Sequence, residues 1–152
     1  MTTCTRILEF DAAHRITRHG SKCRHLHGHR YKAEITCEAE LNDLGMVVDF
    51  GEINATVGAW IDATWDHGAI LNEVDAAYRP AIEAQGHRLY LMPCEPTAEN
   101  MARELLAVAR SIMRSGRLRV LRVRLWETPN SYADADGPTT EPAGREVRLA
   151  AE

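Results

Sequence analysis

Alternating apolar and polar positions predict two neighbouring strands in the first third of the chain. Between Cys4 and His14, one side of an extended backbone would carry the even positions Leu8, Phe10, Ala12 and His14. From Tyr31 to Glu40 the apolar residues and cysteine stand at the odd positions, and the charged residues and threonine at the even ones. If this register continues backwards, His27 and His29 join the apolar face of the second strand.

Helical spacing predicts two helices further along. After a turn at Leu41–Gly45, Asp49 can cap a helix that runs from about Phe50 to Ala63. Thr97 can cap a second helix that runs to about Ser115, because its apolar positions recur every three or four residues: Met101, Leu105, Val108, Ala109 and Ile112.

A third strand follows the second helix, with Leu121, Val123, Leu125 and Glu127 on one face. Arg122 and Arg124 occupy the other face. A carboxylate on the apolar face is unusual and requires an explanation, because charged side chains are rarely buried without a partner.

Two segments are less regular. Residues Asn72–Pro96 contain several prolines and a glycine, and we interpret about 73–95 as an inserted loop in which Arg88–Met92 could form a short strand. Residues 138–152 form a C-terminal tail. Its last part, Glu146–Leu149, could be a short edge strand or be disordered.

Composition and charge predict a single domain whose ligands are small molecules. The 152 residues are 45% hydrophobic, enough for a single core over residues 1–152. A net charge of −4 argues against nucleic acid or an anionic membrane as partner. No signal peptide or membrane-spanning segment is visible, and the four scattered cysteines fit a reducing cytoplasm.

The clearest chemical signal is the run His27-Gly28-His29. Side chains two residues apart on a strand leave the same face, so both imidazoles can converge on one metal ion. Three nitrogens with an open fourth position are typical of catalytic zinc. His14 is our preferred third ligand, and His25 is the alternative if the strand begins early. The competing interpretation is that these are ordinary hydrogen-bonded core or surface histidines. We expect His19 and His87 to be surface residues.

Cys23 and the pair Asp66–His67 are further candidates. An isolated cysteine is more often an inert, partly buried thiol, but a nearby cation would favour a thiolate able to remove a proton from carbon. Asp66 and His67 could form a proton relay in which the carboxylate fixes the tautomer of the imidazole, or they could be an ordinary turn after the helix.

Glu127 and Thr97 have two interpretations each. Glu127 could pair with an arginine, or it could accept two hydrogen bonds from an amidine-like edge such as that of a pterin or guanine. Thr97 is a helix cap, and the same helix end could also bind a ligand.

Six motifs taken together resemble one family, the 6-pyruvoyltetrahydropterin synthases, which include the bacterial 6-carboxytetrahydropterin synthase of the queuosine pathway. The motifs span about residues 4–132 in the order of the family: FDAAHR (10–15), CRHLHGH (23–29), DF (49–50), DH (66–67), PTAEN (96–100) and WET (126–128).

The resemblance implies an α+β tunnelling fold. In this fold a four-stranded antiparallel sheet carries two helices on one face, three chains form a barrel, and two barrels pair into a hexamer with active sites between subunits. By motif position, zinc would be bound by His14, His27 and His29. Cys23, Asp66 and His67 would be catalytic, and Glu127 would anchor the pterin ring.

The implied substrate is 7,8-dihydroneopterin triphosphate. In the carboxy-forming branch the side chain is cleaved to give 6-carboxy-5,6,7,8-tetrahydropterin, with loss of acetaldehyde and triphosphate. The pyruvoyl branch eliminates triphosphate and keeps the three-carbon chain. We favour the carboxy product by analogy, because the chain is short and lacks an added regulatory segment. The alternatives are the pyruvoyl synthase, a related lyase that trims the side chain toward folate, and a non-catalytic pterin- or metal-binding protein.

Overall fold

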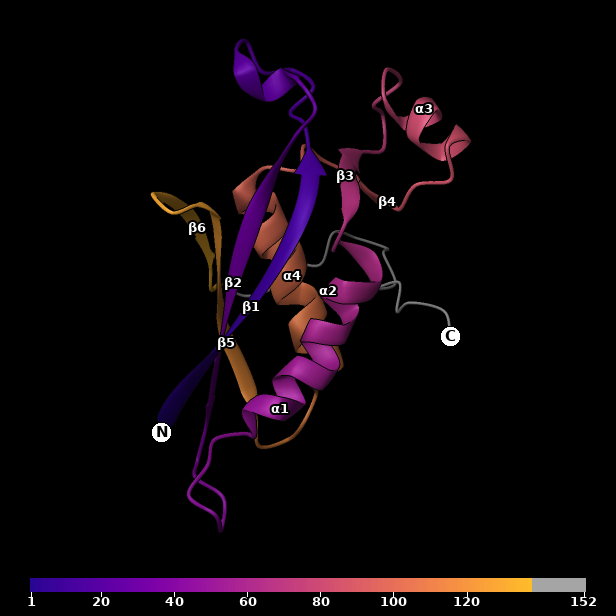
Figure 1. Ribbon diagram of the computed structural model, residues 1–152. Helices are drawn as coiled ribbons and strands as arrows, with labels where there is room; N and C mark the ends of the chain where they lie inside the picture. The colour runs from indigo at the N-terminus through magenta and orange to yellow at the C-terminus, as the bar shows by residue number, and fades with distance from the viewer. Residues whose placement is uncertain (138–152) are drawn as a thin grey trace.

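A computed structural model describes residues 1–137 of the chain, and its centre is one mixed sheet of six strands (Figure 1). The strands are β1 (Thr2–His14), β2 (His27–Ala39), β3 (Gly68–Asn72), β4 (Leu89–Met92), β5 (Arg119–Thr128) and β6 (Ser131–Ala135), arranged in the order β4-β3-β1-β2-β5-β6. The tail 138–152, with its candidate strand Glu146–Leu149, lies outside the described residues.

Strands β1, β2, β5 and β6 form the four-stranded antiparallel unit that the resemblance implied. The two short strands β3 and β4 extend it to six by parallel pairing, β3 on the last residues of β1 and β4 on β3. The sheet is therefore larger than expected, because the chain between the two main helices returns to the edge of β1. Strand β6 was not predicted, since only Ala133 and Ala135 of its five residues are buried apolar side chains.

The alternating pattern places the core as predicted. Tyr31, Ala33, Ile35 and Cys37 are all fully buried on one face of β2, where Tyr31 lies opposite Phe10 of β1 and Ala33 opposite Leu8. The polar positions face the other way, where Arg30 lies 2.7 Å from Asp11 and 3.1 Å from Glu9. We call this second side of the sheet the helix-free face.

Two helices cover the apolar face of the sheet (Figure 1). The first runs without interruption through α1 (Phe50–Ile53), a π-helical turn (Asn54–Gly58) and α2 (Ala59–Thr64), and Asp49 caps it by accepting from the Gly51 amide at 2.7 Å. The second is α4 (Ala98–Ile112), capped by Thr97. Both predicted helix starts are confirmed. Helix α4 ends before Ser115, because Met113 leaves the helical conformation with its side chain buried.

The segment interpreted as an inserted loop contains a short helix, α3 (Arg79–Ala84), followed by the predicted strand β4. A charged contact fastens it to the end of β1. The guanidinium of Arg15 lies 3.1 Å from Asp75, whose side chain is 1% exposed, and also lies over the ring of Tyr78. Nearby, the Thr17 amide donates to Glu95 at 2.8 Å. None of the helices in the described range is long and apolar enough to cross a membrane.

The contact between Arg15 and Asp75 gives a stability prediction. Replacing Asp75 with Asn leaves a nearly buried guanidinium without its counter-charge, and we expect the free energy of unfolding to fall by roughly 3–5 kcal/mol. Glu83→Gln is the matched control, because it removes an exposed ion pair with Arg79 in the same segment and costs at most about 0.5 kcal/mol. Urea unfolding at fixed protein concentration measures both, and equal losses would contradict the prediction.

Candidate active site

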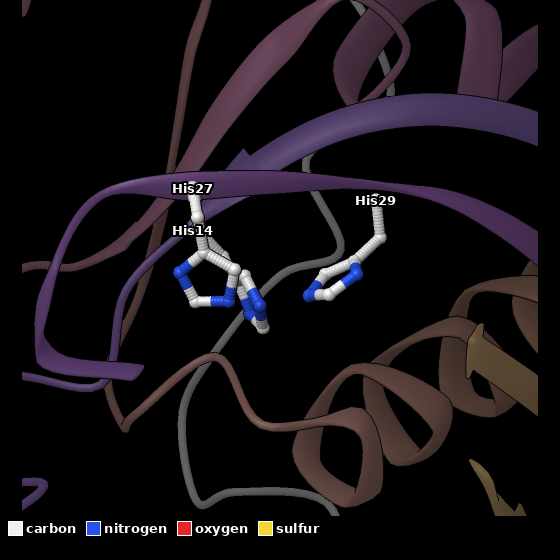
Figure 2. Close-up of side chains that lie close together, drawn as sticks. All are labelled: His14, His27 and His29. Carbon is white, nitrogen blue, oxygen red and sulfur yellow. The ribbon is translucent and has the colours of Figure 1, made fainter. Parts of the chain in front are cut away.

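Three histidine side chains converge at the point where β1 ends and β2 begins (Figure 2). His14 is the last residue of β1 and pairs with His27, the first residue of β2, while His29 lies two residues further on the same face. One nitrogen from each ring lies within 4.8 Å of the other two. We call His14, His27 and His29 the histidine triad.

Gly28 makes this close approach possible. It lies between the two histidines of β2 and pairs with Ala13 of β1. A Cβ atom at this position would lie 3.2 Å from the carbonyl oxygen of Ala12, closer than such atoms normally come. The strands are therefore packed backbone to backbone beside the triad.

Backbone carbonyls orient two of the rings. The Nδ1 atom of His14 lies 2.8 Å from the Pro96 carbonyl oxygen, and Nδ1 of His27 lies 2.7 Å from the His25 carbonyl oxygen. Because a carbonyl can only accept, each Nδ1 carries the proton and donates it. The lone pair of each ring is then on Nε2, which is the arrangement that metal-binding histidines need.

The remaining nitrogens lack partners in a way that fits a metal ion. Nε2 of His14 and Nε2 of His29 are buried, and neither has a hydrogen-bond partner among residues 1–137. A buried polar atom without a partner costs about 1–3 kcal/mol, so such atoms are rare unless a bound species satisfies them. The donor set, three imidazole nitrogens, suits zinc and other divalent transition metals.

Burial also favours the neutral form of His14 and of His29. It is the largest cause that lowers the pKa of His14 below its ordinary value, and the other two rings of the triad act in the same direction against the opposing effects of Pro96 and Glu127. Burial likewise lowers the pKa of His29. A metal ligand must be unprotonated, so these shifts favour binding at neutral pH.

The structure places His14, and not the alternative His25, beside His27 and His29. Cys23 lies in a short 3₁₀ turn, Lys22–Arg24, so the strand does not begin early and His25 is exposed outside the sheet. His25 contributes its backbone carbonyl to the ring of His27, and its own ring is not part of the triad. His19 and His87 are exposed, as expected.

Glu127, near the end of β5, faces the triad. Its two carboxylate oxygens lie 3.8 Å from Nε2 of His14 and 3.8 Å from Nε2 of His29. Among the described residues it forms no ion pair with an arginine, because Arg122 and Arg124 both lie next to Asp134 instead. Pairing with an arginine therefore does not explain this carboxylate, and both oxygens can accept from a ligand.

A cavity of about 300 Å³ lies beside Glu127 and His29. The rest of its wall comes from Glu9, Arg30, Lys32, Trp126, Thr128 and Pro129. Sequence reasoning selected none of these six as site residues, and it did not select Tyr31, the neighbour of Arg30. Their positions in the alternating strands predict only which face they occupy, and a cavity at the rim of a sheet has no signal in the pattern.

Asp66 and His67 do form a pair, with Nδ1 of His67 lying 2.7 Å from Asp66. The pair is held against β1, because the Asp11 amide donates to Asp66 at 2.9 Å and the His67 amide donates to the Asp11 carbonyl at 2.7 Å. His67 adopts the left-handed conformation, with a φ of 55°, as the chain turns from α2 into β3. Burial raises the pKa of Asp66, but the hydrogen bonds from Asp11 and His67 outweigh it and the net shift is downward.

This pair lies apart from the triad. Its ligand atoms cluster with the carboxylate of Asp11, whose side chain pairs with Arg30 on the helix-free face. Within the described residues, no hydrogen bond or ion pair joins Asp66 or His67 to Cys23 or to the triad. The His67 side chain is 76% exposed. One chain therefore presents the expected catalytic residues as two separate groups.

Cys23 and Thr97 each lie close in the sequence to a carbonyl that orients a ring of the triad, that of His25 or Pro96. The partly exposed Cys23 is four residues before His27, and its carbonyl accepts from the Ile16 amide at 2.8 Å. Thr97 directly follows Pro96, which holds His14, and its hydroxyl accepts from the Asn100 amide at 3.3 Å. The capping role of Thr97 is confirmed, and its role in binding substrate stays a prediction.

Comparison with known proteins identifies the family. A family model described as 6-pyruvoyl tetrahydropterin synthase matches residues 3–138. The 6-carboxy-5,6,7,8-tetrahydropterin synthase of Rickettsia bellii is 43% identical over 137 residues, which cover 88% of this chain and 99% of that protein. The enzyme of the same name from Haemophilus influenzae is 30% identical over 132 residues, covering 82% and 92% of the two chains.

Solved structures share the fold. An uncharacterised protein from Wolinella succinogenes superposes with a TM-score of 0.78 at 23% identity, over 89% of this chain and 97% of that one. The 6-pyruvoyl tetrahydropterin synthase of Caenorhabditis elegans gives a TM-score of 0.66 at 23% identity, over 90% and 95%. The sheet and its two covering helices are thus those of the tunnelling fold, and the chain belongs to the 6-pyruvoyl tetrahydropterin synthase family of pterin-converting enzymes.

Proposed function

We propose that the chain is a zinc-dependent lyase that converts 7,8-dihydroneopterin triphosphate to 6-carboxy-5,6,7,8-tetrahydropterin, with release of acetaldehyde and triphosphate, in the synthesis of queuosine. The observation that carries the proposal is that Nε2 of His14 and Nε2 of His29 are buried opposite the carboxylate of Glu127 and have no hydrogen-bond partner in the part of the chain that the structure describes. The names of the bacterial relatives support the carboxy product.

The histidine triad would hold the zinc ion. When bound, zinc would supply Lewis acidity that makes hydroxyl groups of the substrate side chain easier to deprotonate. The Pro96 and His25 carbonyls keep two of the rings in the tautomer that this role needs. Glu127 would accept two hydrogen bonds from the amidine edge of the pterin, and Thr97 would contact the substrate at the start of α4.

Cys23 and the pair Asp66–His67 would move protons between the ring and the side chain. Asp66 stays ionised because its pKa is held low, and it fixes the proton of His67 on Nδ1. Nε2 of His67 is then free to accept or donate a proton on the exposed side. Because this pair lies on the helix-free side and 76% of the His67 side chain is exposed, we propose that it serves the triad of another subunit.

The sheet has edges that suit a homohexamer built from two trimeric barrels. In the described part of the chain, β3 pairs only with the last residues of β1, so Thr2–Asp11 has a neighbouring strand on one side only, and β6 is an outer strand. Unpaired strand edges are templates for pairing with another chain. Ile7 and Tyr132, 49% and 48% exposed on these strands, would be covered in the assembly. A cytoplasmic location stays a prediction.

The test of the proposal is product identification. Zinc-loaded protein would be incubated anaerobically with 7,8-dihydroneopterin triphosphate, and the products identified by mass spectrometry. We expect acetaldehyde and 6-carboxytetrahydropterin. A pyruvoyl product would assign the chain to the other branch, a different trimmed pterin would indicate the folate-type lyase, and binding without turnover would indicate a non-catalytic pterin-binding protein.

Loss of one triad member should abolish tight zinc binding. His29→Ala removes one of three protein ligands, so we expect zinc affinity to fall by more than the roughly 10–100-fold that loss of an outer hydrogen-bond partner costs. Competition with a chromophoric chelator measures it. His19→Ala removes an exposed histidine outside the triad and should leave affinity unchanged. Equal affinities for both variants would refute the metal site.

Subunit mixing tests whether the two catalytic groups come from different chains. Cys23→Ala and His67→Ala should each be inactive alone. Co-expressed with different tags, they should regain about one quarter of wild-type turnover, the share of sites that receive both intact groups by random mixing in a symmetric oligomer.

The control for this experiment is co-expression of Cys23→Ala with the double variant Cys23→Ala/His67→Ala. No chain in this mixture carries Cys23, so no turnover should be recovered. If the first mixture also stays inactive although mixed oligomers are isolated, the two groups act within one chain.

A further inference from the structure

Tyr31 occupies a position in β2 that the proposed mechanism leaves without a role. Its side chain is fully buried, and its ring stacks on Phe10 with a centroid separation of 5.1 Å and an interplanar angle of 13°. The same ring meets His14 and His29 edge-on, at centroid separations of 5.8 and 5.6 Å. Tyr31 therefore lies in the wall of the candidate active site and is held there by packing on several sides.

The phenolic hydroxyl of Tyr31 is buried, and no residue between 1 and 137 offers it a hydrogen-bond partner. A buried tyrosine hydroxyl normally has a partner, because leaving it unsatisfied costs free energy. Phenylalanine would make the same stacking contacts without this cost. The packing of the core accordingly gives no reason for the hydroxyl, whereas a ligand that accepts a hydrogen bond does.

The surroundings of the hydroxyl point to the kind of ligand. A tyrosine hydroxyl carries its proton at neutral pH, so the group can donate a hydrogen bond. The Tyr31 ring contacts His14 and His29, two of the three residues that would hold the zinc ion. In the proposed reaction, the substrate atoms beside that ion would belong to the hydroxylated side chain, which offers oxygen acceptors.

We propose that Tyr31 is a substrate-binding residue whose hydroxyl donates a hydrogen bond to an oxygen of the pterin side chain. The inference rests on the proposed function. It adds a contact that distinguishes pterins with a hydroxylated side chain from pterins whose side chain has no hydroxyl group. A site built around a buried donor rejects ligands that cannot satisfy it.

The test uses Tyr31→Phe with two ligands that differ only in the substituent at position 6. Binding of 7,8-dihydroneopterin, which has side-chain hydroxyls, and of 6-methyl-7,8-dihydropterin, which has none, would be measured anaerobically by calorimetry on zinc-loaded protein. We expect Tyr31→Phe to weaken dihydroneopterin about tenfold, equivalent to 1.4 kcal/mol, and to leave the methyl compound unchanged.

Stability provides a second measurement, in which Tyr31→Phe should not be harmful although it weakens ligand binding. Tyr31→Phe removes a polar group that has no partner within residues 1–137, so the urea midpoint of the ligand-free protein should stay the same or rise. Tyr90→Phe is the matched control, because the Tyr90 hydroxyl donates to Glu104 at 2.6 Å and its loss should lower the midpoint without changing the binding of either ligand.

The outcomes separate this inference from the proposed function. If wild-type protein binds both pterins and Tyr31→Phe weakens neither, or weakens both equally, the contact with the side chain does not exist. A lower urea midpoint for Tyr31→Phe would show that the hydroxyl has a structural partner, and would also overturn the inference. If wild-type protein binds neither pterin, the proposed function itself fails.

Discussion

The pairing of β1 with β2 is the constraint on which the site depends. The two strands are in register from Thr2 opposite Ala39 to His14 opposite His27, and this register brings the ends of both strands to one point. A slip of one residue would turn His27 and His29 to the helix-free face, because side chains alternate along a strand. The stacked rings of Phe10 and Tyr31, and the two helices that cover the same face, make such a slip costly.

The apolar core of the protein also sets the chemistry of the site. The face of the sheet that buries Tyr31, Ala33 and Ile35 continues into His29 and His27 without a break. Burial there favours the neutral form of His29 and, within residues 1–137, leaves its Nε2 atom without a hydrogen-bond partner. The same apolar packing that stabilises the fold therefore prepares a site for a cation and a polar ligand.

The parts of the structure that could be predicted are those set by local patterns. Strand periodicity located β1, β2 and β5 and placed Glu127 on the apolar face, and capping residues located the starts of both covering helices. The parallel pairing of β3 and β4 could not be predicted, because it joins segments far apart in the chain and each strand is short.

The remaining features of the site depend on backbone atoms and on chain direction. The carbonyl of Pro96 that orients His14 has no side-chain signal. Likewise, adjacency of Asp66 and His67 in the sequence does not reveal that the left-handed turn at His67 directs the pair toward Asp11, away from the triad. Membership of the family could be inferred from the motifs, whereas the separation of the two groups required coordinates.

The tight packing at Gly28 limits how this site can change during evolution. Any side chain there would push the Ala12 carbonyl away by a few tenths of an ångström, and β1 would move relative to β2 where His14 faces His27. Metal–ligand distances vary by only about 0.2 Å between sites, so even alanine at this position would move the triad out of the geometry that a metal ion needs. The exposed neighbours His25 and Arg30 are not under this restriction. We therefore expect the central glycine to be as invariant among homologues as the histidines themselves, although it contributes no atom to the chemistry.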